Sequence, residues 1–254
     1  MGYIEKYSRK YQVTTNDVDF TKKMKLSAAL NYFQEVSELH TEELGIGFNT
    51  LEKELGIAWV LARIKIDMVK YPLWNDEIIV ETWHQIPKKY EFERDYYIRD
   101  LDGNILVKAS SLWVIVDIKT RRLMKSEIIK IEYPSIFEER ATDFRFSKIR
   151  PAGNAEKVYD RVIGCSDIDM NYHVNNSKYL DFIFDCFDME VLKNYYAKSA
   201  EIHYNNETFT GDIITMYKYT DEVKSGKIYV EGTNAKKGVR VFISQIEFSP
   251  NYIE

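Results

Sequence analysis

The segment Asp17-Val-Asp-Phe-Thr-Lys-Lys-Met-Lys-Leu-Ser-Ala-Ala-Leu30 returns later in the chain as Asp167-Ile-Asp-Met-Asn-Tyr-His-Val-Asn-Asn-Ser-Lys-Tyr-Leu180. The two segments align without a gap, and two aspartates, a serine and a leucine recur at the same stations. A second pair of segments, Ile66–Ile78 and Ile202–Ile214, matches in the same order along the chain. Because self-similarity that keeps its order is typical of repeated units, the sequence predicts a tandem duplication.

The first copy reads as a strand, a turn, a helix and then several strands. The helix is expected to begin near Ser27, with an apolar stripe at the 3.6-residue spacing formed by Leu26, Ala29, Leu30, Phe33, Val36 and Leu39. Asn49 and Thr50 are expected to cap a shorter helix that ends near Gly56. The strands are expected at Ala58–Met68, Glu77–His84, Phe92–Arg99 and Val107–Asp117, with a hairpin turn at Asp102-Gly103.

The second copy repeats this order. A strand over Val158–Gly164 is expected to lead into a turn and then into a helix over Ser177–Asp188, with Asn175 or Asn176 as its N-cap. The strands that follow are expected at Lys198–Asn205, Asp212–Thr220, Lys227–Asn234 and Val239–Phe248. Between the copies, residues 133–156 hold two prolines and a glycine among mixed charges, which is typical of a linker crossing a surface.

A long helix on a curved antiparallel sheet, built twice, is an α+β arrangement. It matches the hotdog fold, in which a sheet wraps one helix and two copies normally pair. We therefore expect a tandem double hotdog, with an N-terminal hotdog over residues 1–132, a linker over 133–156 and a C-terminal hotdog over 157–254.

Composition excludes several classes of protein. The chain has 254 residues, is 45% hydrophobic and carries a net charge of −5, which allows a sizeable core and argues against a general nucleic-acid binder. No apolar run approaches the length of a membrane span, and the opening MGYIEKYSRK is charged where a signal peptide needs apolar residues. With two cysteines and no zinc-ligand spacing, we expect a reduced cytoplasmic protein without a metal or another cofactor, and without membrane insertion.

The densest polar constellation runs from Ser166 to Asn176, between a strand and a helix N-terminus. Unpaired amides and the helix dipole favour negative charge there, so the place suits an oxyanion. The first copy has Thr21 in place of Asn171 and Lys23 in place of His173. The turn can therefore be built without the asparagine and the histidine, which indicates a functional role for both.

Glu207 follows Asn205-Asn206, a poor strand former, and its counterpart in the first copy is Tyr71. Taken alone, Glu207 reads as an exposed strand end. His203 shares its parity and is a rival titratable group, although a core-edge histidine fits it better.

The remaining histidines and cysteines have simpler interpretations. His40 and His84 read as structural or solvated residues. Cys165 and Cys186 read as small core residues rather than nucleophiles.

The string Asp169-Met-Asn171-Tyr-His173-Val-Asn-Asn, joined downstream by Tyr204-Asn-Asn-Glu207, resembles the acyl-acyl carrier protein (acyl-ACP) thioesterases. These are tandem double-hotdog enzymes of plant plastids and many bacteria, and the length of this chain is similar to the bacterial branch. The resemblance implies hydrolysis of the thioester that links a fatty acyl chain to acyl carrier protein (ACP). It also implies that Asp169, Asn171, His173 and Glu207 are the catalytic residues, and that the first hotdog holds the acyl chain under its long helix.

The chemistry can be argued beside that resemblance. A thiol leaves readily, with a pKa of about 8.5, so thioester hydrolysis needs an activated water and an oxyanion site more than a strong acid. We expect Glu207 to act as general base and Asn171 to polarise the carbonyl. His173 would orient the water or share its proton, and Asp169 would fix the histidine or the loop. Thr208 stands where plant members have a cysteine, which argues against a papain-like thiol mechanism.

The expected partner, acylated ACP, is acidic like the chain itself, so docking needs a local basic cluster. Four clusters are candidates: Lys88 with Lys89, Lys119 with Arg121 and Arg122, Lys148 with Arg150, and Lys236 with Lys237 and Arg240. Trp59, Met68, Trp74 and Trp83 are candidates for lining the acyl cavity or for plain core. Internal pairing of the halves favours a monomer or a weak homodimer.

Two other functions stay open. An acyl-CoA thioesterase breaks the same bond, and only the carrier differs. A non-catalytic acyl-binding hotdog protein, or a lipid-responsive regulator, would need no hydrolysis; against a regulator, the sequence offers no helix-turn-helix candidate or basic extension.

Overall fold

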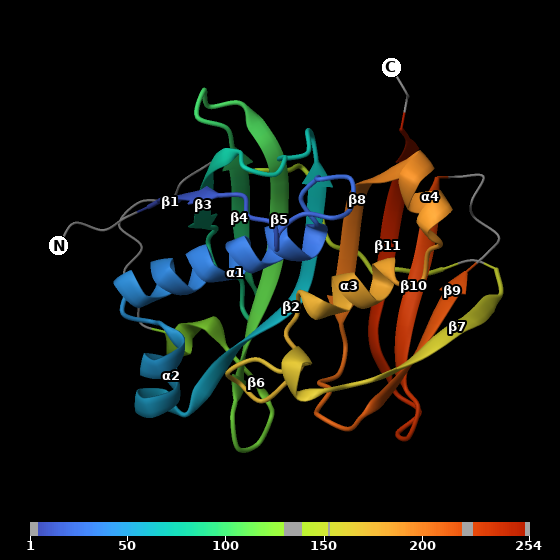
Figure 1. Cartoon of the computed structure of the whole chain (residues 1–254). Coiled ribbons are helices and arrows are strands. Elements are labelled where there is room, and N and C mark those ends of the chain that lie inside the picture. Colours follow the sequence, from blue (N-terminus) through green and yellow to red (C-terminus); the bar gives the residue numbers. More distant parts are fainter. Residues whose placement is uncertain (1–4, 130–138, 152, 220–225, 252–254) are drawn as a thin grey trace. The chain divides into compact units, whose positions relative to one another are not determined.

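The computed structural model describes residues 5–129, 139–151, 153–219 and 226–251 (Figure 1). The chain divides into two compact units, the first made of residues 1–64 and 69–145 and the second of residues 65–68 and 146–254. Each unit holds a helix and a sheet, so the predicted α+β fold is confirmed. Part of the predicted linker, residues 130–138 and 152, lies outside the described residues.

In the first unit, helix α1 lies across one face of the sheet (Figure 1). The strand order is β1-β3-β4-β5-β2, with β6 paired to β5, and β1–β3, β3–β4 and β4–β5 are antiparallel. The elements are β1 (Tyr7–Gln12), α1 (Leu26–Glu43), α2 (Phe48–Leu55), β2 (Ile57–Met68), β3 (Glu77–His84), β4 (Phe92–Arg99), β5 (Ile105–Asp117), β6 (Leu123–Met124) and a 3₁₀ turn over Ser126–Ile128.

The second unit repeats the plan with a shorter helix, α3, beside its sheet (Figure 1). Its strand order is β8-β11-β10-β9-β7, and each of these neighbouring pairs is antiparallel. The elements are β7 (Ala155–Val162), a 3₁₀ turn over Cys165–Asp167, α3 (Lys178–Phe184), α4 (Met189–Asn194), β8 (Tyr195–Tyr204), β9 (Ile213–Tyr219), β10 (Lys227–Asn234) and β11 (Arg240–Pro250).

The turn before α1 and the turn before α3 share their backbone hydrogen bonds. In the first unit the N–H of Asp19 donates to the carbonyl of Lys23 at 2.9 Å, and in the second the N–H of Asp169 donates to the carbonyl of His173 at 2.8 Å. These pairs stand at the stations that the sequence alignment equates. The predicted duplication is therefore visible bond by bond in the backbone.

The two matched segments of each copy also meet in the same way. The N–H of Met24 donates to the carbonyl of Pro72 at 2.9 Å, and the N–H of Val174 donates to the carbonyl of Thr208 at 3.0 Å. Each bond ties the turn before the helix to the segment after a long strand. This tie fixes which residues become neighbours at the turn.

Helix α1 buries an apolar stripe at its start and a polar one toward its end. Leu26, Ala29, Leu30, Phe33 and Val36 are buried as the 3.6-residue spacing predicts. Leu39 is only half-buried, and the inner face continues instead through the buried Ser37, His40 and Thr41. The apolar pattern of the sequence could not show this change, because polar residues at helical spacing usually read as the solvated face.

Residues 139–142 strap the first unit's sheet on the face away from α1. The Arg140 guanidinium lies 2.8 Å from the fully buried carboxylate of Asp95, which also accepts the hydroxyl of Ser110 and the N–H of Ala141. The indole of Trp83 donates to the carbonyl of Glu139 at 2.8 Å. A buried carboxylate needs such partners, so these residues belong to the first unit's structure.

Several element boundaries differ from the sequence predictions, and two helices and strand β7 are examples. Helix α2 begins at Phe48 with Gly47 as N-cap, before Asn49 and Thr50, because the N–H of Leu51 already bonds the carbonyl of Gly47. The helix predicted over Ser177–Asp188 ends at Phe184, since Asp188 in extended conformation caps a separate helix, α4. Strand β7 runs from Ala155 to Val162, so it begins three residues and ends two residues earlier than predicted.

Among the described residues, no helix is long and apolar enough to cross a membrane.

Candidate active site

The turn before α3 holds three of the predicted site residues. The carboxylate of Asp169 accepts the N–H of Asn171 at 2.8 Å, while the Asp169 N–H donates to the carbonyl of His173. Both bonds are to the backbone, so Asp169 holds the shape of the loop rather than the imidazole ring. Asn171 is exposed on the same turn, and its bond to Asp169 leaves its side-chain amide unused.

His173 and Glu207 come together from two segments far apart in sequence. The Nε2 of His173 lies 3.4 Å from the Oε2 of Glu207, and their side chains are 27% and 32% exposed. Both groups are thus within reach of one water molecule, and both remain open to solvent. A carboxylate and an imidazole in this arrangement can activate a water molecule.

The segment after β8 presents Glu207 by alternation. Thr208 is fully buried and its carbonyl accepts the N–H of Val174, so its neighbours Glu207 and Phe209 turn outward. The N–H of Phe209 donates to the carboxylate of Asp212 at 3.1 Å, which holds the turn. Residues 205–212, which are not part of a strand, are therefore held by these hydrogen bonds and do not form a loose strand end.

Phe209 is a site residue that sequence reasoning missed. Its ring meets the ring of His173 edge-on, with 5.0 Å between the centroids, and the Nζ of Lys237 lies 5.3 Å from the centre of the Phe209 ring. An aromatic ring in this position restricts the orientation of the imidazole. The period-two relation of Phe209 to Glu207 was the sequence feature that could have shown it.

Tyr172 stands at the tip of the turn. It has a left-handed backbone with φ of 64° and is 82% exposed. Lys22, at the same station of the first copy, has φ of 63°. A conformation that costs L-residues energy is kept in both turns, so it belongs to the shared scaffold and not to the site.

His203, the rival titratable group, lies elsewhere. Its Nε2 is 2.6 Å from the Oε1 of Glu201 on the same strand, and both residues are buried. His203 therefore sits with Glu201 rather than with Glu207.

The two cysteines differ in their burial. Cys186 is buried and burial raises the pKa of its thiol to about 12, so it is protonated and inert, as expected of a core cysteine. Cys165 is exposed, so its assignment to the core was wrong. The reason is that the 3₁₀ turn over Cys165–Asp167 buries Asp167 instead, whose carboxylate accepts from Arg161 at 3.0 Å. The described residues include no group of three or more His, Cys, Asp or Glu side chains that could hold a metal ion.

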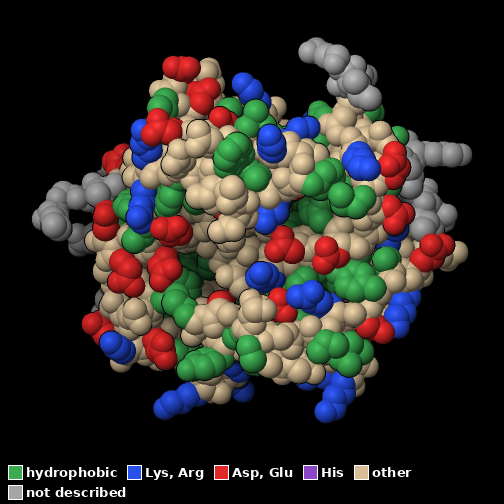
Figure 2. Space-filling view, in the orientation of Figure 1, with side chains coloured by type: hydrophobic (Ala, Val, Ile, Leu, Met, Phe, Trp, Pro, Cys, Tyr) green, Lys and Arg blue, Asp and Glu red, His purple; other side chains and the backbone are tan. Residues whose placement is uncertain are grey.

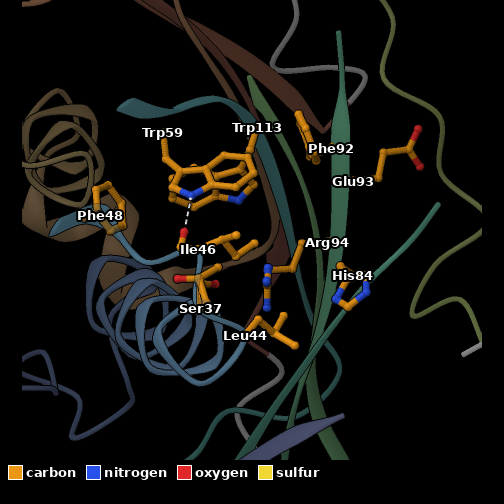
Figure 3. Close-up of a pocket in the computed structure, with 11 residues that line it drawn as sticks. Ser37, Leu44, Ile46, Phe48, Trp59, His84, Phe92, Glu93, Arg94 and Trp113 are labelled. Carbon is orange, nitrogen blue, oxygen red and sulfur yellow. Dashed lines mark hydrogen bonds between the residues drawn. The ribbon is translucent and has the colours of Figure 1, made fainter. Parts of the chain in front are cut away.

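The first unit contains a pocket between the end of α1 and the sheet (Figure 3). Its apolar wall consists of Leu44, Ile46, Phe48, Trp59, Phe92 and Trp113, and its polar wall of Ser37, Thr41, His84, Glu93 and Arg94. Of the tryptophans considered from sequence, Trp59 lines this pocket, Trp74 is 48% exposed, and Trp83 is buried beside Tyr97 and Ala141 under the strap.

His40 and His84 are structural rather than solvated. His40 is fully buried, and the two rings lie 5.6 Å apart. Burial, helped by Arg94 and His40, lowers the pKa of His84 to about 3, so this imidazole is neutral at pH 7.

Comparison with known families accounts for nearly the whole chain. Residues 4–131 match the acyl-ACP thioesterase N-terminal domain, and residues 154–249 match the acyl-ACP thioesterase C-terminal domain. The chain is 29% identical over 245 residues to the chloroplastic oleoyl-acyl carrier protein thioesterase 1 of Arabidopsis thaliana, covering 90% of this chain and 66% of that protein. It is 29% identical over 225 residues to the oleoyl-acyl carrier protein thioesterase of Coriandrum sativum, covering 82% and 61%. The chain thus spans slightly less than two thirds of these relatives' lengths.

Solved structures share the fold. An acyl-ACP thioesterase from Bacteroides thetaiotaomicron superimposes with a TM-score of 0.87 at 24% identity, covering 96% of this chain and 98% of the other. The 12:0-ACP thioesterase from Umbellularia californica gives a TM-score of 0.84 at 21% identity, covering 97% and 94%. At these identities the likeness establishes the shared double-hotdog architecture.

Proposed function

The chain belongs to the acyl-ACP thioesterase family, and from this premise we propose that it hydrolyses the thioester of fatty acyl-ACP, releasing a free fatty acid and ACP. One observation carries the proposal beyond family membership. His173 and Glu207, which lie on separate segments, approach to 3.4 Å and remain open to water. The first copy has the same backbone without this pair, so the pair is not required by the fold.

The proposed reaction begins with a water held between the two side chains. The Glu207 carboxylate takes a proton from this water as its oxygen attacks the carbonyl carbon of the thioester. The carbonyl oxygen becomes an oxyanion, which the side-chain amide of Asn171 and nearby backbone N–H groups stabilise. When the C–S bond breaks, the proton passes to the leaving thiolate, whose pKa of about 8.5 makes it a good leaving group.

His173 and Asp169 have supporting roles in this scheme. His173 orients the water against Glu207 and shares its proton, while the edge-on ring of Phe209 restricts the imidazole. Asp169 positions the loop through its bonds to the backbone of Asn171 and His173. Asp169 is thus a positioning residue, and the three others are the catalytic residues of the proposal.

The pocket in the first unit is the proposed site for the acyl chain. Its aromatic and aliphatic wall, which includes Phe48, Trp59 and Trp113, offers the apolar surface that a hydrocarbon chain buries. It lies beside the end of α1, the place that the family resemblance implies. The exposed Trp74 does not contribute to this wall.

The test is release of free thiol from acyl-ACP by Glu207→Gln and His173→Ala. Each variant should lower kcat by about 10²-fold or more, the usual scale for loss of general acid–base catalysis. The matched controls are Tyr71→Phe and Lys23→Ala, at the equivalent stations of the first copy, which should hydrolyse at the wild-type rate. Wild-type rates in both site variants would refute the assignment.

The carrier is tested by the same assay. We expect ACP rather than coenzyme A to carry the preferred substrate, so kcat/KM for one acyl chain should be higher on ACP than on CoA. Figure 2 shows Lys and Arg side chains interspersed with Asp and Glu over the face in view. We therefore expect the acidic ACP to bind a local cluster of basic side chains. A cytoplasmic location and a monomeric or weakly dimeric state stay predictions from the sequence.

A further inference from the structure

The pocket proposed for the acyl chain has a polar end that a plain hydrocarbon does not need. Ser37 and Thr41 line it from α1, and Arg94 and His84 line it from adjacent strands β4 and β3. Figure 3 shows the Arg94 side chain reaching between Ser37 and Leu44, while Trp59 and Trp113 gather at the other end. The pocket is therefore divided into an aromatic end and a hydrogen-bonding end.

Arg94 brings a positive charge to that end. Its side chain is buried, with 7% of the residue exposed, and its Nη1 donates to the Nδ1 of His40 at 3.0 Å and to the hydroxyl of Thr82 at 3.2 Å. A guanidinium can only donate, so the Nδ1 of His40 is an acceptor without a proton. Both contacts therefore fix the position of the guanidinium at this end of the pocket.

His84 adds a second kind of hydrogen-bonding group. Because burial, Arg94 and His40 keep its pKa low, the ring that lines the pocket is a neutral imidazole with one donor nitrogen and one acceptor nitrogen. A guanidinium beside a neutral imidazole suits an oxygen-bearing group, which can accept from the first and exchange a hydrogen bond with the second.

Ser37, which lines this end of the pocket, belongs to a buried chain of hydrogen bonds. The hydroxyl of Tyr96 lies 2.9 Å from that of Ser37 and 3.0 Å from that of Ser111, which also accepts the indole N–H of Trp113 at 2.9 Å. This buried chain of hydrogen bonds holds the Ser37 hydroxyl in place. A methylene group beside Arg94 and His84 makes no hydrogen bond with either of them, whereas an oxygen-bearing group can.

We propose that the Arg94 end of this pocket selects acyl chains that carry an oxygen-bearing group, a hydroxyl or a carboxylate, over plain hydrocarbon chains of the same length. The apolar wall takes the methylenes and the polar end takes the oxygen. The inference rests on the proposed function for the identity of the substrate, but it concerns the pocket of the first unit alone.

The experiment compares acyl-ACPs of one chain length in three forms: plain, hydroxylated along the chain, and ending in a carboxylate. The wild-type protein should show kcat/KM about 10-fold or more higher for an oxygenated form, because a site built to hydrogen-bond a group rejects the analogue that lacks it. The hydroxyl and carboxylate arms identify which oxygen group the guanidinium prefers. Arg94→Met, which keeps length and removes the donors, should reduce this ratio to about one.

Arg99→Met is the matched control, since Arg99 lies on the same strand and binds Glu81 and the Gly103 carbonyl instead of lining the pocket. It should keep the wild-type ratio. Equal or faster hydrolysis of plain chains by the wild-type protein overturns the inference, whether or not Arg94→Met folds. An unchanged ratio in folded Arg94→Met overturns it as well.

A binding measurement separates this inference from the proposed function. Trp59 and Trp113 line the pocket, so their fluorescence reports its occupant. The methyl esters of a plain and a hydroxylated fatty acid serve as probes without an ACP carrier. Tighter binding of the hydroxylated ester, lost in Arg94→Met, with no hydrolysis of any acyl-ACP, would sustain the pocket inference and refute the function. Hydrolysis with tighter binding of the plain ester would do the reverse.

Discussion

The turn before α1 and the turn before α3 have one backbone and two different surfaces. At equivalent stations the first turn places the Nζ of Lys23 5.7 Å from the centre of the Tyr71 ring, and the second places His173 3.4 Å from Glu207. The hydrogen bonds beneath these pairs are the same in both turns. The duplicated scaffold thus keeps its main chain, and the two turns differ in the side chains that point outward.

The aspartates that support the two turns have different partners but the same role. The carboxylate of Asp17 accepts from Thr14 and from the hydroxyl of Tyr32, and that of Asp167 accepts from Gly164 and from the guanidinium of Arg161. Each aspartate ties the incoming strand to the turn. The support can therefore be exchanged as long as the carboxylate keeps its donors.

The largest effect is expected when the second turn receives the two residues that the first turn has at the same stations, Lys23 and Tyr71. His173→Lys with Glu207→Tyr should lower kcat by about 10³-fold, because both groups that contact the water are lost. The protein should stay folded, since the first turn already accommodates Lys23 and Tyr71 on the same backbone. Thiol release and thermal melting provide the two measurements.

The reciprocal variant is the control. Lys23→His with Tyr71→Glu should leave kcat unchanged, because the second turn still carries the reaction. A double exchange in the second turn that keeps wild-type turnover, or one that fails to fold, would contradict the separation of scaffold from chemistry.

A second way concerns histidine burial in the first half. His84 has a pKa of about 3 in the folded protein against an unfolded value of about 6.5, so the unfolded chain binds the proton first. Above pH 6.5 His84 is neutral in both states and does not change the free energy of unfolding. Between pH 6 and pH 4 the free energy of unfolding falls by about 1.4 kcal/mol per pH unit, because only the unfolded chain protonates this histidine. Urea unfolding of the wild type and His84→Gln at pH 6 and pH 5 measures it.

The variant should lose less stability than the wild type over that step, by about 1 kcal/mol. Between pH 7 and pH 8 the two proteins should show the same slope, because both His84 states are neutral there. Parallel losses between pH 6 and pH 5 would show that burial does not hold His84 neutral.

A third way separates positioning from catalysis. Asp169→Ala should lower kcat by about 10-fold, because the loop that presents His173 loses an anchor. Asp169→Asn keeps an acceptor oxygen and should restore most of the rate. Asp19→Ala removes the equivalent bond to Thr21 and should cost about 1 kcal/mol of stability without any change in kcat. Equal kinetic effects of Asp19→Ala and Asp169→Ala would contradict the division between the two turns.

The smallest expected effect lies in the hairpin turns. The β10–β11 turn carries Lys236 and Lys237, and the equivalent β4–β5 turn carries Asp100 and Asp102. Since Lys237 lies over Phe209 beside His173, we expect Lys236→Glu with Lys237→Glu to raise KM for acyl-ACP a few-fold at low salt. Asp102→Lys should leave KM within error, and the difference should shrink at high salt. A KM unaffected by both changes would place ACP on another cluster.

Periodicity and repetition made much of the fold predictable. Strands β3, β4 and β10 have the predicted bounds, because alternating apolar residues end at turn formers there. Helix ends were harder, since Asp188 looks the same as the last residue of one helix or the cap of the next. Strand β1 and the strap at 139–142 had too few apolar residues to predict a position.

The candidate site could be proposed from sequence where the repeat supplied a control. The contrast of Lys23 with His173 indicated function in one turn alone, and the structure brings His173 to Glu207. Phe209 was missed because an aromatic residue after a strand usually reads as core. The polar end of the first unit's pocket was missed because only packing shows that Ser37, His40 and Arg94 face inward.

The strap at 139–142 determines where the chain can be cut. A fragment that stops at residue 132, the boundary suggested by sequence, would leave Asp95 without Arg140 and Trp83 without the carbonyl of Glu139. A fragment that continues through Arg145 retains both the Arg140 side chain and the Glu139 carbonyl. Anyone excising the first half for crystallisation, fragment complementation or domain grafting should therefore carry these thirteen or so extra residues, because an ionised carboxylate stripped of its arginine is among the costliest groups to keep inside a protein.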